Sequence, residues 1–281
     1  MKKKILLILV ILVPAMLKAQ WTDEYGTWMS VGAKKNLGTR WSLGFETEYR
    51  AQESSRWAFG LDAGYKLNKT IKFGAGYSFL YSRKPEIWKD KSEGDPIFDD
   101  PTVLGSYNLT KAYRYPRHRF VVEATADKRF WKWLRVSLRE RYQLTYRPGK
   151  TIENGKLKHR VSLDFDEDFN PIPFYNDEYE DKIVDSKTDQ VLRSRLKLEV
   201  DKKHWKFSPY VSAEAINSVS VGDHMCIEKV RTAVGTSYKL NKQHEFTLGY
   251  VLTFVFNDDD EKADTYNNRI HAVSVGYNFK F

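Results

Sequence analysis

Charged side chains at alternate positions are the residues of this sequence best suited to chemistry. In several segments they recur every second residue, and alternate residues of a β-strand share one face. The basic members are Arg135, Arg139, Arg141, Arg193, Arg195 and Lys197. The acidic members are Glu46, Glu48, Asp62, Glu123, Glu199 and Glu214. If these segments are strands of one sheet, both sets point to the same side of it.

Two uses of such a face are open. In a narrow barrel, long side chains of opposite charge can pair across the lumen and form a polar core. The basic residues can instead form a stripe that guides anions through a pore. A barrel of about twelve strands leaves little free bore, which favours the ion-paired core over the conducting stripe.

A hydrolytic site is not indicated by the histidines. Outer-membrane phospholipases and lipid A deacylases place His and Ser two residues apart, so that the base reaches the nucleophile on one strand face. The six histidines are His118, His159, His204, His224, His244 and His271, and none has a Ser two residues away. Ser274 lies three residues after His271, on the opposite face. We therefore expect no catalytic residues, and a lipid-modifying enzyme is the least favoured alternative.

Two acidic clusters raise the question of calcium. Residues Asp164–Asp168 and Asn257–Glu261 are rich in carboxylates, which suit hard cations. Neither cluster has the spacing or the required glycine of an EF-hand loop. We expect solvated loops and no metal or cofactor, with weak divalent bridging to surface lipopolysaccharide as the alternative.

Strands must position all of these groups, because a two-residue period runs through the chain. In residues 41–50, Trp41, Leu43 and Phe45 alternate with small or polar residues. Comparable segments lie at about 25–34, 57–67, 71–81, 120–129, 134–146, 192–200, 207–217, 229–240, 246–256 and 268–281. Their length suits a tilted strand that crosses the hydrocarbon layer of a membrane.

These segments predict an all-β fold, an antiparallel transmembrane outer-membrane β-barrel of about 12 strands, with 10 to 14 acceptable. Short periplasmic turns alternate with long extracellular loops, of which Arg83–Pro116 and Arg147–Gln190 read as irregular apart from a hairpin near Leu157–Phe165. Eleven segments are counted, whereas a barrel with both ends in the periplasm needs an even number. Either residues 20–27 run through or beside the wall, or one strand has been missed.

One residue breaks the alternation. Glu140 falls on the apolar face of its segment. We expect it near the outer membrane interface, where its cost is small, and the alternative is a β-bulge that reverses the facing.

The N-terminus predicts export. Lys2–Lys4 precede an apolar run at residues 5–17 and then Ala19, the pattern of a cleaved signal peptide at 1–19 before a single barrel domain at 20–281. An uncleaved anchor is the alternative. Cleavage removes four lysines, which lowers the formal charge from +9 to +5, and this mild basicity does not indicate nucleic acid. Cys226 is the sole cysteine and cannot form an intrachain disulfide.

Both ends of the mature sequence resemble known families. The last segment ends in aromatic-x-Phe at Phe281, which resembles the closing strand of bacterial outer-membrane barrels, where the barrel-assembly machinery reads a terminal Phe. Residues 21–50, with Gly26-Thr27-Trp28 and Trp41-Ser42-Leu43, resemble a secreted Gram-negative family, domain of unknown function 2490. This resemblance covers the mature chain and implies an outer-membrane barrel of unassigned activity, with no catalytic residues to carry over.

The functional expectation is correspondingly broad. We expect a narrow small-solute channel or a ligand-binding barrel that is not an enzyme. The alternative is a structural or surface-interaction barrel that acts through its long loops. The expected partners are outer-membrane lipid and lipopolysaccharide, the barrel-assembly machinery and an unidentified small molecule.

Overall fold

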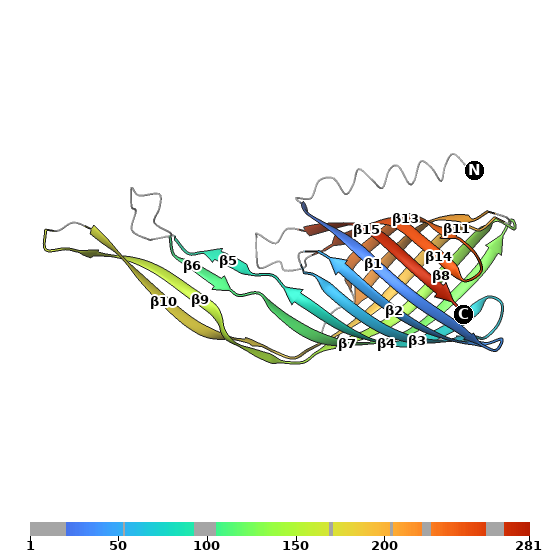
Figure 1. The fold of residues 1–281 in the computed structure, drawn as a ribbon, viewed down its shortest axis with the longest axis horizontal. Helices are drawn as coiled ribbons and strands as arrows, with labels where there is room; N and C mark the ends of the chain where they lie inside the picture. The colour runs from blue at the N-terminus through green and yellow to red at the C-terminus, as the bar shows by residue number, and fades with distance from the viewer. Residues whose placement is uncertain are drawn as a thin grey trace.

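The residues that the structure describes form two β-sheets, a closed barrel and a smaller sheet that projects from it (Figure 1). The computed structural model describes residues 21–52, 54–92, 105–168, 171–202, 205–220, 226–256 and 267–281. Across those ranges, no helix is long and apolar enough to cross a membrane.

Eleven strands form the barrel, so the expected fold class is confirmed and the count lies within the expected range. They are β1 (Trp21–Leu37), β2 (Trp41–Ala51), β3 (Arg56–Lys66), β4 (Ile71–Lys84), β7 (Tyr113–Phe130), β8 (Leu134–Arg147), β11 (Lys187–Val200), β12 (Phe207–Ser218), β13 (Cys226–Lys239), β14 (His244–Val255) and β15 (Asn267–Lys280). Around the barrel their order is β1-β15-β14-β13-β12-β11-β8-β7-β4-β3-β2.

The odd number is possible because the barrel closes with a parallel pair. β1 runs beside β15 in continuous register from Trp21↔Asn267 to Lys34↔Lys280, while every other neighbouring pair is antiparallel. The backbone N–H of Phe281 also donates to the Lys34 carbonyl, at 2.9 Å. Our requirement for an even number, and with it the preference for twelve strands, was therefore wrong. Residues 21–27 are part of the wall itself.

Five short connections lie at the same end of the barrel as Phe281. In two of them an asparagine side chain holds the turn: Asn68 Oδ1 accepts from the backbone N–H groups of residues 70 and 71, and Asn241 Oδ1 from those of residues 243 and 244. The β7–β8 turn has positive φ at Trp131 (48°) and Lys132 (63°), as a tight hairpin of matching twist requires.

The two segments that we expected to be irregular loops contain strands, which corrects that prediction. The hairpin expected near Leu157–Phe165 is confirmed, because these residues pair antiparallel with residues 171–179. They hold β5 (Ile87–Asp90), β6 (Tyr107–Thr110), β9 (Lys150–Phe165) and β10 (Pro171–Val184), paired in the order β10-β9-β6-β5. These strands continue β11, β8, β7 and β4 beyond the barrel, and we call this sheet the arm (Figure 1). Prolines at positions 171 and 173 hid the pattern of β10, and an edge strand tolerates them.

The barrel is apolar outside and charged inside, the arrangement of a membrane barrel. Apolar side chains such as Leu43, Phe59, Phe120 and Leu248 are exposed on the exterior. A small apolar cluster of Trp28, Val251 and Ala272 lies within the wall's inner face, and most other inward side chains are polar or small.

Glu140 does lie on the apolar face, but neither expectation about it holds. β8 pairs with both neighbours without a register shift, so no bulge is present. Glu140 sits at the middle of β8 and not at its outer end. Its carboxylate accepts a hydrogen bond from Ser194 Oγ at 2.6 Å on the adjacent strand, which satisfies one of its oxygens.

Candidate functional site

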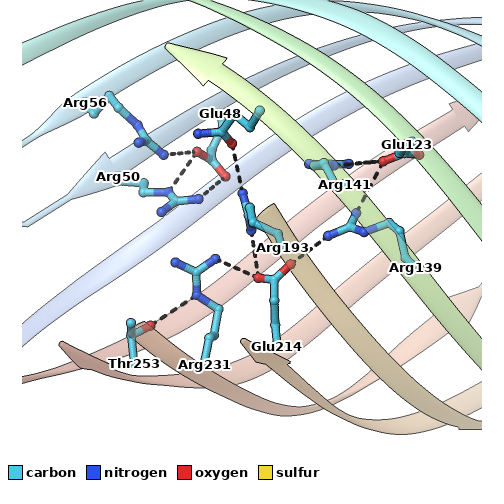
Figure 2. A network of polar contacts seen from close by, with 11 residues as sticks. Glu48, Arg50, Arg56, Glu123, Arg139, Arg141, Arg193, Glu214, Arg231 and Thr253 are labelled. Carbon is cyan, nitrogen blue, oxygen red and sulfur yellow. Dashed lines mark hydrogen bonds and ion pairs between the residues drawn. The ribbon is translucent and has the colours of Figure 1, made fainter. Parts of the chain in front are cut away.

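The inner wall carries a network of arginines and glutamates, and Glu214 on β12 is its centre (Figure 2). Arg139 Nη2 donates to Glu214 Oε1 at 2.9 Å, and Arg193 Nη2 donates to Oε2 at 2.7 Å. Arg231 Nη1 donates to Oε2 at 3.4 Å, while its Nε donates to Thr253 at 3.1 Å. The Glu214 side chain is only 4% exposed, so three arginines from three strands neutralise a buried carboxylate.

A second centre is Glu48 on β2. Arg50 donates to it through two nitrogens at 2.8 and 2.9 Å, and Arg56 on β3 donates at 2.8 Å. Trp28 connects the two centres, because the Arg50 guanidinium lies 3.8 Å from its ring centre and that of Arg231 lies 4.9 Å away.

A third centre is Glu123 on β7. Arg141 Nε donates to it at 2.8 Å, and Arg139 Nη1 lies 3.8 Å away. Arg139 therefore joins Glu123 to Glu214. Through Trp28 and these arginines the network links β1, β2 and β3 with β7, β8, β11, β12 and β13. Figure 2 shows the hydrogen bonds and ion pairs of the three centres.

The predicted basic residues fall into three groups. Arg139, Arg141 and Arg193 belong to the network. Arg135 pairs with Asp127 at 3.0 Å, and Lys197 pairs with Glu199 at 2.5 Å, both outside it. Arg195 makes no hydrogen bond or ion pair within the described part of the chain, and its Nε is buried.

The predicted acidic residues divide in the same way. Three of them, Glu48, Glu123 and Glu214, accept the arginine hydrogen bonds of the network. Glu199 forms an ion pair with Lys197 outside it. Glu46 and Asp62 form no ion pair with any described residue and line a cavity instead.

Sequence reasoning missed Arg50, Arg56, Arg231 and Trp28 as members of the site. Arg50 was recognisable, because it lies on the inward face two residues after Glu48. Arg56 begins β3 and is followed on the inward face by Ala58 and Gly60, so no polar neighbour marked it. Trp28 had no such signal. It is an aromatic residue facing inward on β1, where the two-residue contrast is weak.

The cavity has a volume of about 620 Å³ and lies at the short-turn end of the lumen, between β1–β4, β7 and β8. It reaches the β1–β2 turn at Gly38–Arg40. Glycines keep its wall thin: a Cβ on Gly74 would lie 2.9 Å from Glu123 Cγ, and one on Gly44 would overlap the Asp62 carboxylate. Both acidic side chains can therefore lie flat against the wall and leave the space open.

Other candidate sites are accounted for by local pairs. Within the described ranges, four histidines bind a Tyr or Asp: His118 with Tyr77, His244 with Tyr277, His271 with Tyr250 and His159 with Asp177. His204, His224 and the Asn257–Glu261 cluster lie outside the described residues. In the part that is described, no group of three or more His, Cys, Asp or Glu side chains is arranged to hold a metal ion.

Comparison with protein families gives a match over residues 25–264 to the family described as "protein of unknown function (DUF2490)". The chain belongs to the DUF2490 family. Membership confirms the resemblance seen in the sequence and assigns no activity. No curated protein matches the chain.

Two solved structures resemble this DUF2490 chain in shape. The translocator domain of the autotransporter NalP from Neisseria meningitidis is 11% identical, with 88% of this chain and 77% of that chain covered and a TM-score of 0.46. The toluene transporter TbuX from Ralstonia pickettii is 10% identical, with coverages of 86% and 78% and a TM-score of 0.40. At such low identity and TM-score, neither likeness bears on function.

Proposed function

We propose that this protein is an outer-membrane barrel that holds a small ligand in its lumen and does not act as an open pore. The observation that carries the proposal is the network around Glu214, in which guanidinium groups from three strands share one buried carboxylate. To open a path at this level, several charge-assisted hydrogen bonds must break at once, and an unpaired charge must remain in a region of low dielectric.

The cavity below the network supports the ligand-holding half of the proposal. Its volume of about 620 Å³ is within the usual range of small-molecule sites, about 300–1,000 Å³. Polar groups of several strands converge on it, among them Glu46, Asp62 and Arg141. A solute that enters from the short-turn end therefore reaches a cavity that the network closes at its far end, and the polar groups lining it can fix the orientation of the solute.

Swelling of proteoliposomes tests the closure. Liposomes that contain the folded protein are placed in isotonic solutions of small neutral sugars, and light scattering reports solute entry. We expect no faster swelling than in protein-free liposomes, and a general porin serves as the positive control. Swelling at a rate comparable to the porin would remove the closed-barrel proposal.

The outer membrane is the proposed location, with the arm outside the cell and Phe281 on the periplasmic side. The apolar exterior and the short and long connections support this orientation. Export through the signal peptide at 1–19, contact with lipid and lipopolysaccharide, and delivery by the barrel-assembly machinery belong to the same proposal. Phe281 is 70% exposed and available for recognition. Its deletion should reduce insertion into the outer membrane, measured by fractionation, and unchanged insertion would contradict the role.

A non-catalytic role is also part of the proposal. The purified protein, incubated with phospholipid and with lipopolysaccharide, should release no fatty acid above a heat-denatured control. Saturable release that follows the folded fraction would overturn this element.

A second candidate function rests on the arm. This sheet stands free of the barrel (Figure 1) and carries large exposed side chains, including Phe174, Tyr179 and Ile183. We propose it as the alternative working surface of the protein, toward other molecules at the cell surface. Replacing residues 87–110 and 150–184 with short turns should leave the barrel folded and remove surface interactions. If the shortened barrel retains every interaction of the full chain, the arm is not the working surface.

A further inference from the structure

Beyond the end of the cavity that lies away from the short turns, the lumen holds a cluster in which arginines outnumber carboxylates. We call it the arginine roof. It consists of Arg50, Arg56, Arg117, Arg119, Arg193 and Arg231, and the carboxylates within it are Glu48 and Glu214. Four of these arginines share the two carboxylates, and Arg117 donates to the neutral Ser82 Oγ at 2.7 Å.

Arg119 is the least compensated member. The charges that act on it most strongly are all positive and belong to Arg50, Arg56, Arg117 and Arg193. Among the described residues it has no hydrogen-bond acceptor, and its Nε is fully shielded from solvent. A half-buried guanidinium group whose Nε is shielded from water and whose neighbours carry like charges is unfavourable unless an anion binds there.

Other members of the roof repeat this feature. The Nε atoms of Arg56, Arg117 and Arg193 are also buried without an acceptor in the part of the chain that the structure describes. Four guanidinium groups thus present unused donors in one region of the lumen. Guanidinium forks of this kind match the oxygen atoms of phosphate, sulfate and carboxylate groups.

Strand register connects the roof to the cavity. Arg119 on β7 pairs directly with Ser78 on β4, and Val121 is the next inward residue of β7. Both Ser78 and Val121 line the cavity. Arg119 itself does not line the cavity, so a ligand reaches it by extending one inward position of β7 beyond Val121.

We propose that the arginine roof binds one oxyanion group, such as phosphate, sulfate or carboxylate, of a small solute held in the cavity. This rests on the proposed ligand-holding function and adds the chemical class of the ligand. Glu46 and Asp62 line the cavity below the roof, so a second negative group on the same solute is disfavoured. The site suits a compact solute with one anionic end, and it does not suit a polyanion.

Isothermal titration calorimetry of the folded full barrel in a non-ionic detergent tests the proposal, with inorganic phosphate as the probe. Ionic strength is held constant with chloride, and sulfate and acetate are titrated in parallel. We expect saturable binding of at least one of these oxyanions, competing with the others and not with chloride. The Arg119→Gln variant should bind at least about tenfold more weakly, because it loses a hydrogen bond between charged groups.

Arg135→Gln is the matched control. It removes a lumen arginine that is paired with Asp127 and lies outside the roof, so its affinity should stay within about twofold of wild type. Arg119→Lys, which keeps the charge, should recover part of the binding. Heat-modifiable migration in unboiled gels confirms that each variant is folded.

Wild-type protein that binds none of the three oxyanions overturns the proposal, whatever the variants do. Equal affinity of wild type and folded Arg119→Gln also overturns it, because binding then lies elsewhere. The closed-barrel proposal is judged separately by liposome swelling. If the protein does not swell liposomes and binds no oxyanion, only the oxyanion proposal is contradicted. If it swells liposomes and binds an oxyanion, only the closed-barrel proposal is contradicted.

Discussion

The barrel and the arm are two halves of one run of strands, and they use charge differently. β4, β7, β8 and β11 line the lumen and then continue as β5, β6, β9 and β10. In the barrel, the side chains of Arg139 and Glu214 are 10% and 4% exposed. In the arm, those of Lys158 and Glu180 are 33% and 34% exposed. Closure of the sheet gives the first pair an interior, whereas the second pair remains in water.

The stabilisation that a cross-strand charge pair provides therefore depends on how far the pair is buried. An exposed pair contributes about 0–1 kcal/mol, because water and salt screen it. Removal of one partner from a buried pair costs about 3–5 kcal/mol, because the other charge is left uncompensated. The same residue types therefore contribute strongly to the stability of the barrel and little to that of the arm.

The arm is held by aromatic side chains instead. Trp88, Tyr107, His159 and Tyr175 lie one on each of its four strands, with successive ring centres 4.7, 4.8 and 5.6 Å apart. Cross-strand ring pairs of this kind stabilise a sheet that has only one layer. Because the rings face one another, they are occupied in holding the strands together.

Glu214→Ala should have the largest effect. It leaves Arg139, Arg193 and Arg231 without their shared carboxylate, so the free energy of unfolding should fall by about 3–5 kcal/mol. Guanidinium unfolding in micelles, followed by tryptophan fluorescence, measures it. The arm variant Glu178→Ala is the control and should change the value by less than about 1 kcal/mol. Equal losses of stability at the two positions would contradict the claim that charge pairs contribute more in the barrel than in the arm.

Gly74→Leu comes next. Its side chain needs the space that Glu123 occupies, so we expect a loss of about 1–3 kcal/mol from overpacking and a reduced cavity. The neighbouring Ala75→Leu points to the exterior and should be close to neutral. The same unfolding measurement compares the two, and a neutral Gly74→Leu would show that Glu123 does not lie against the wall.

Tyr107→Ala should affect the arm alone. The change removes the ring between Trp88 and His159, at an expected cost of about 0.5–1.5 kcal/mol for each lost ring pair. Limited proteolysis should then cleave the arm faster while the heat-modifiable migration of the barrel is unchanged. Lys89→Ala, on the opposite face, is the control. Unaltered protection of the arm would argue against the aromatic ladder.

The smallest effect concerns pH and the pair Lys158–Glu180. The hydrogen bond from Lys158 lowers the pKa of Glu180 and raises the pKa of Lys158. The Glu180 contribution is thus present above the ordinary glutamate pKa of about 4.3 and is lost as the pH falls through the lowered value. The Lys158 contribution is present below about 10.4 and is lost as the pH rises through the raised value.

Because this pair is exposed, its pH effect on the arm should be slight. In wild type, the proteolysis rate of the arm should be constant near neutral pH and rise modestly at low pH. The rise should be smaller in Lys158→Ala, because this variant lacks the pair at every pH. An identical acid response in the two proteins would mean that the pair does not contribute.

Most of the barrel follows from the sequence because alternation of residue types is a local property. Trp41 to Arg50 shows its two faces without reference to any other strand. The parallel closure of β1 on β15 does not follow, since it joins residues 21–34 to residues 267–280 and depends on the geometry of the whole barrel. The arm was missed because prolines and carboxylates obscure the period of β10.

The sequence predicts which side chains of the candidate site point into the barrel, but it does not predict which of them form ion pairs with one another. The sequence identified Arg139 and Glu214 as inward residues, but they lie 75 positions apart and on strands that are not neighbours. The cavity was not predicted from the sequence, because glycines, which have no side chain, leave the space that forms it. Gly60, Gly64, Gly74 and Gly76 on the polar faces of two consecutive strands mark where space remains.

Single-channel recording in planar bilayers tests most directly the claim that the network closes the lumen. We expect no conductance steps from inserted wild-type protein, and steps from the double variant Glu214→Ala, Arg193→Ala, which removes the central carboxylate and the arginine bound to it most closely. Steady wild-type conductance equal to that of the double variant would show that the network does not close the lumen.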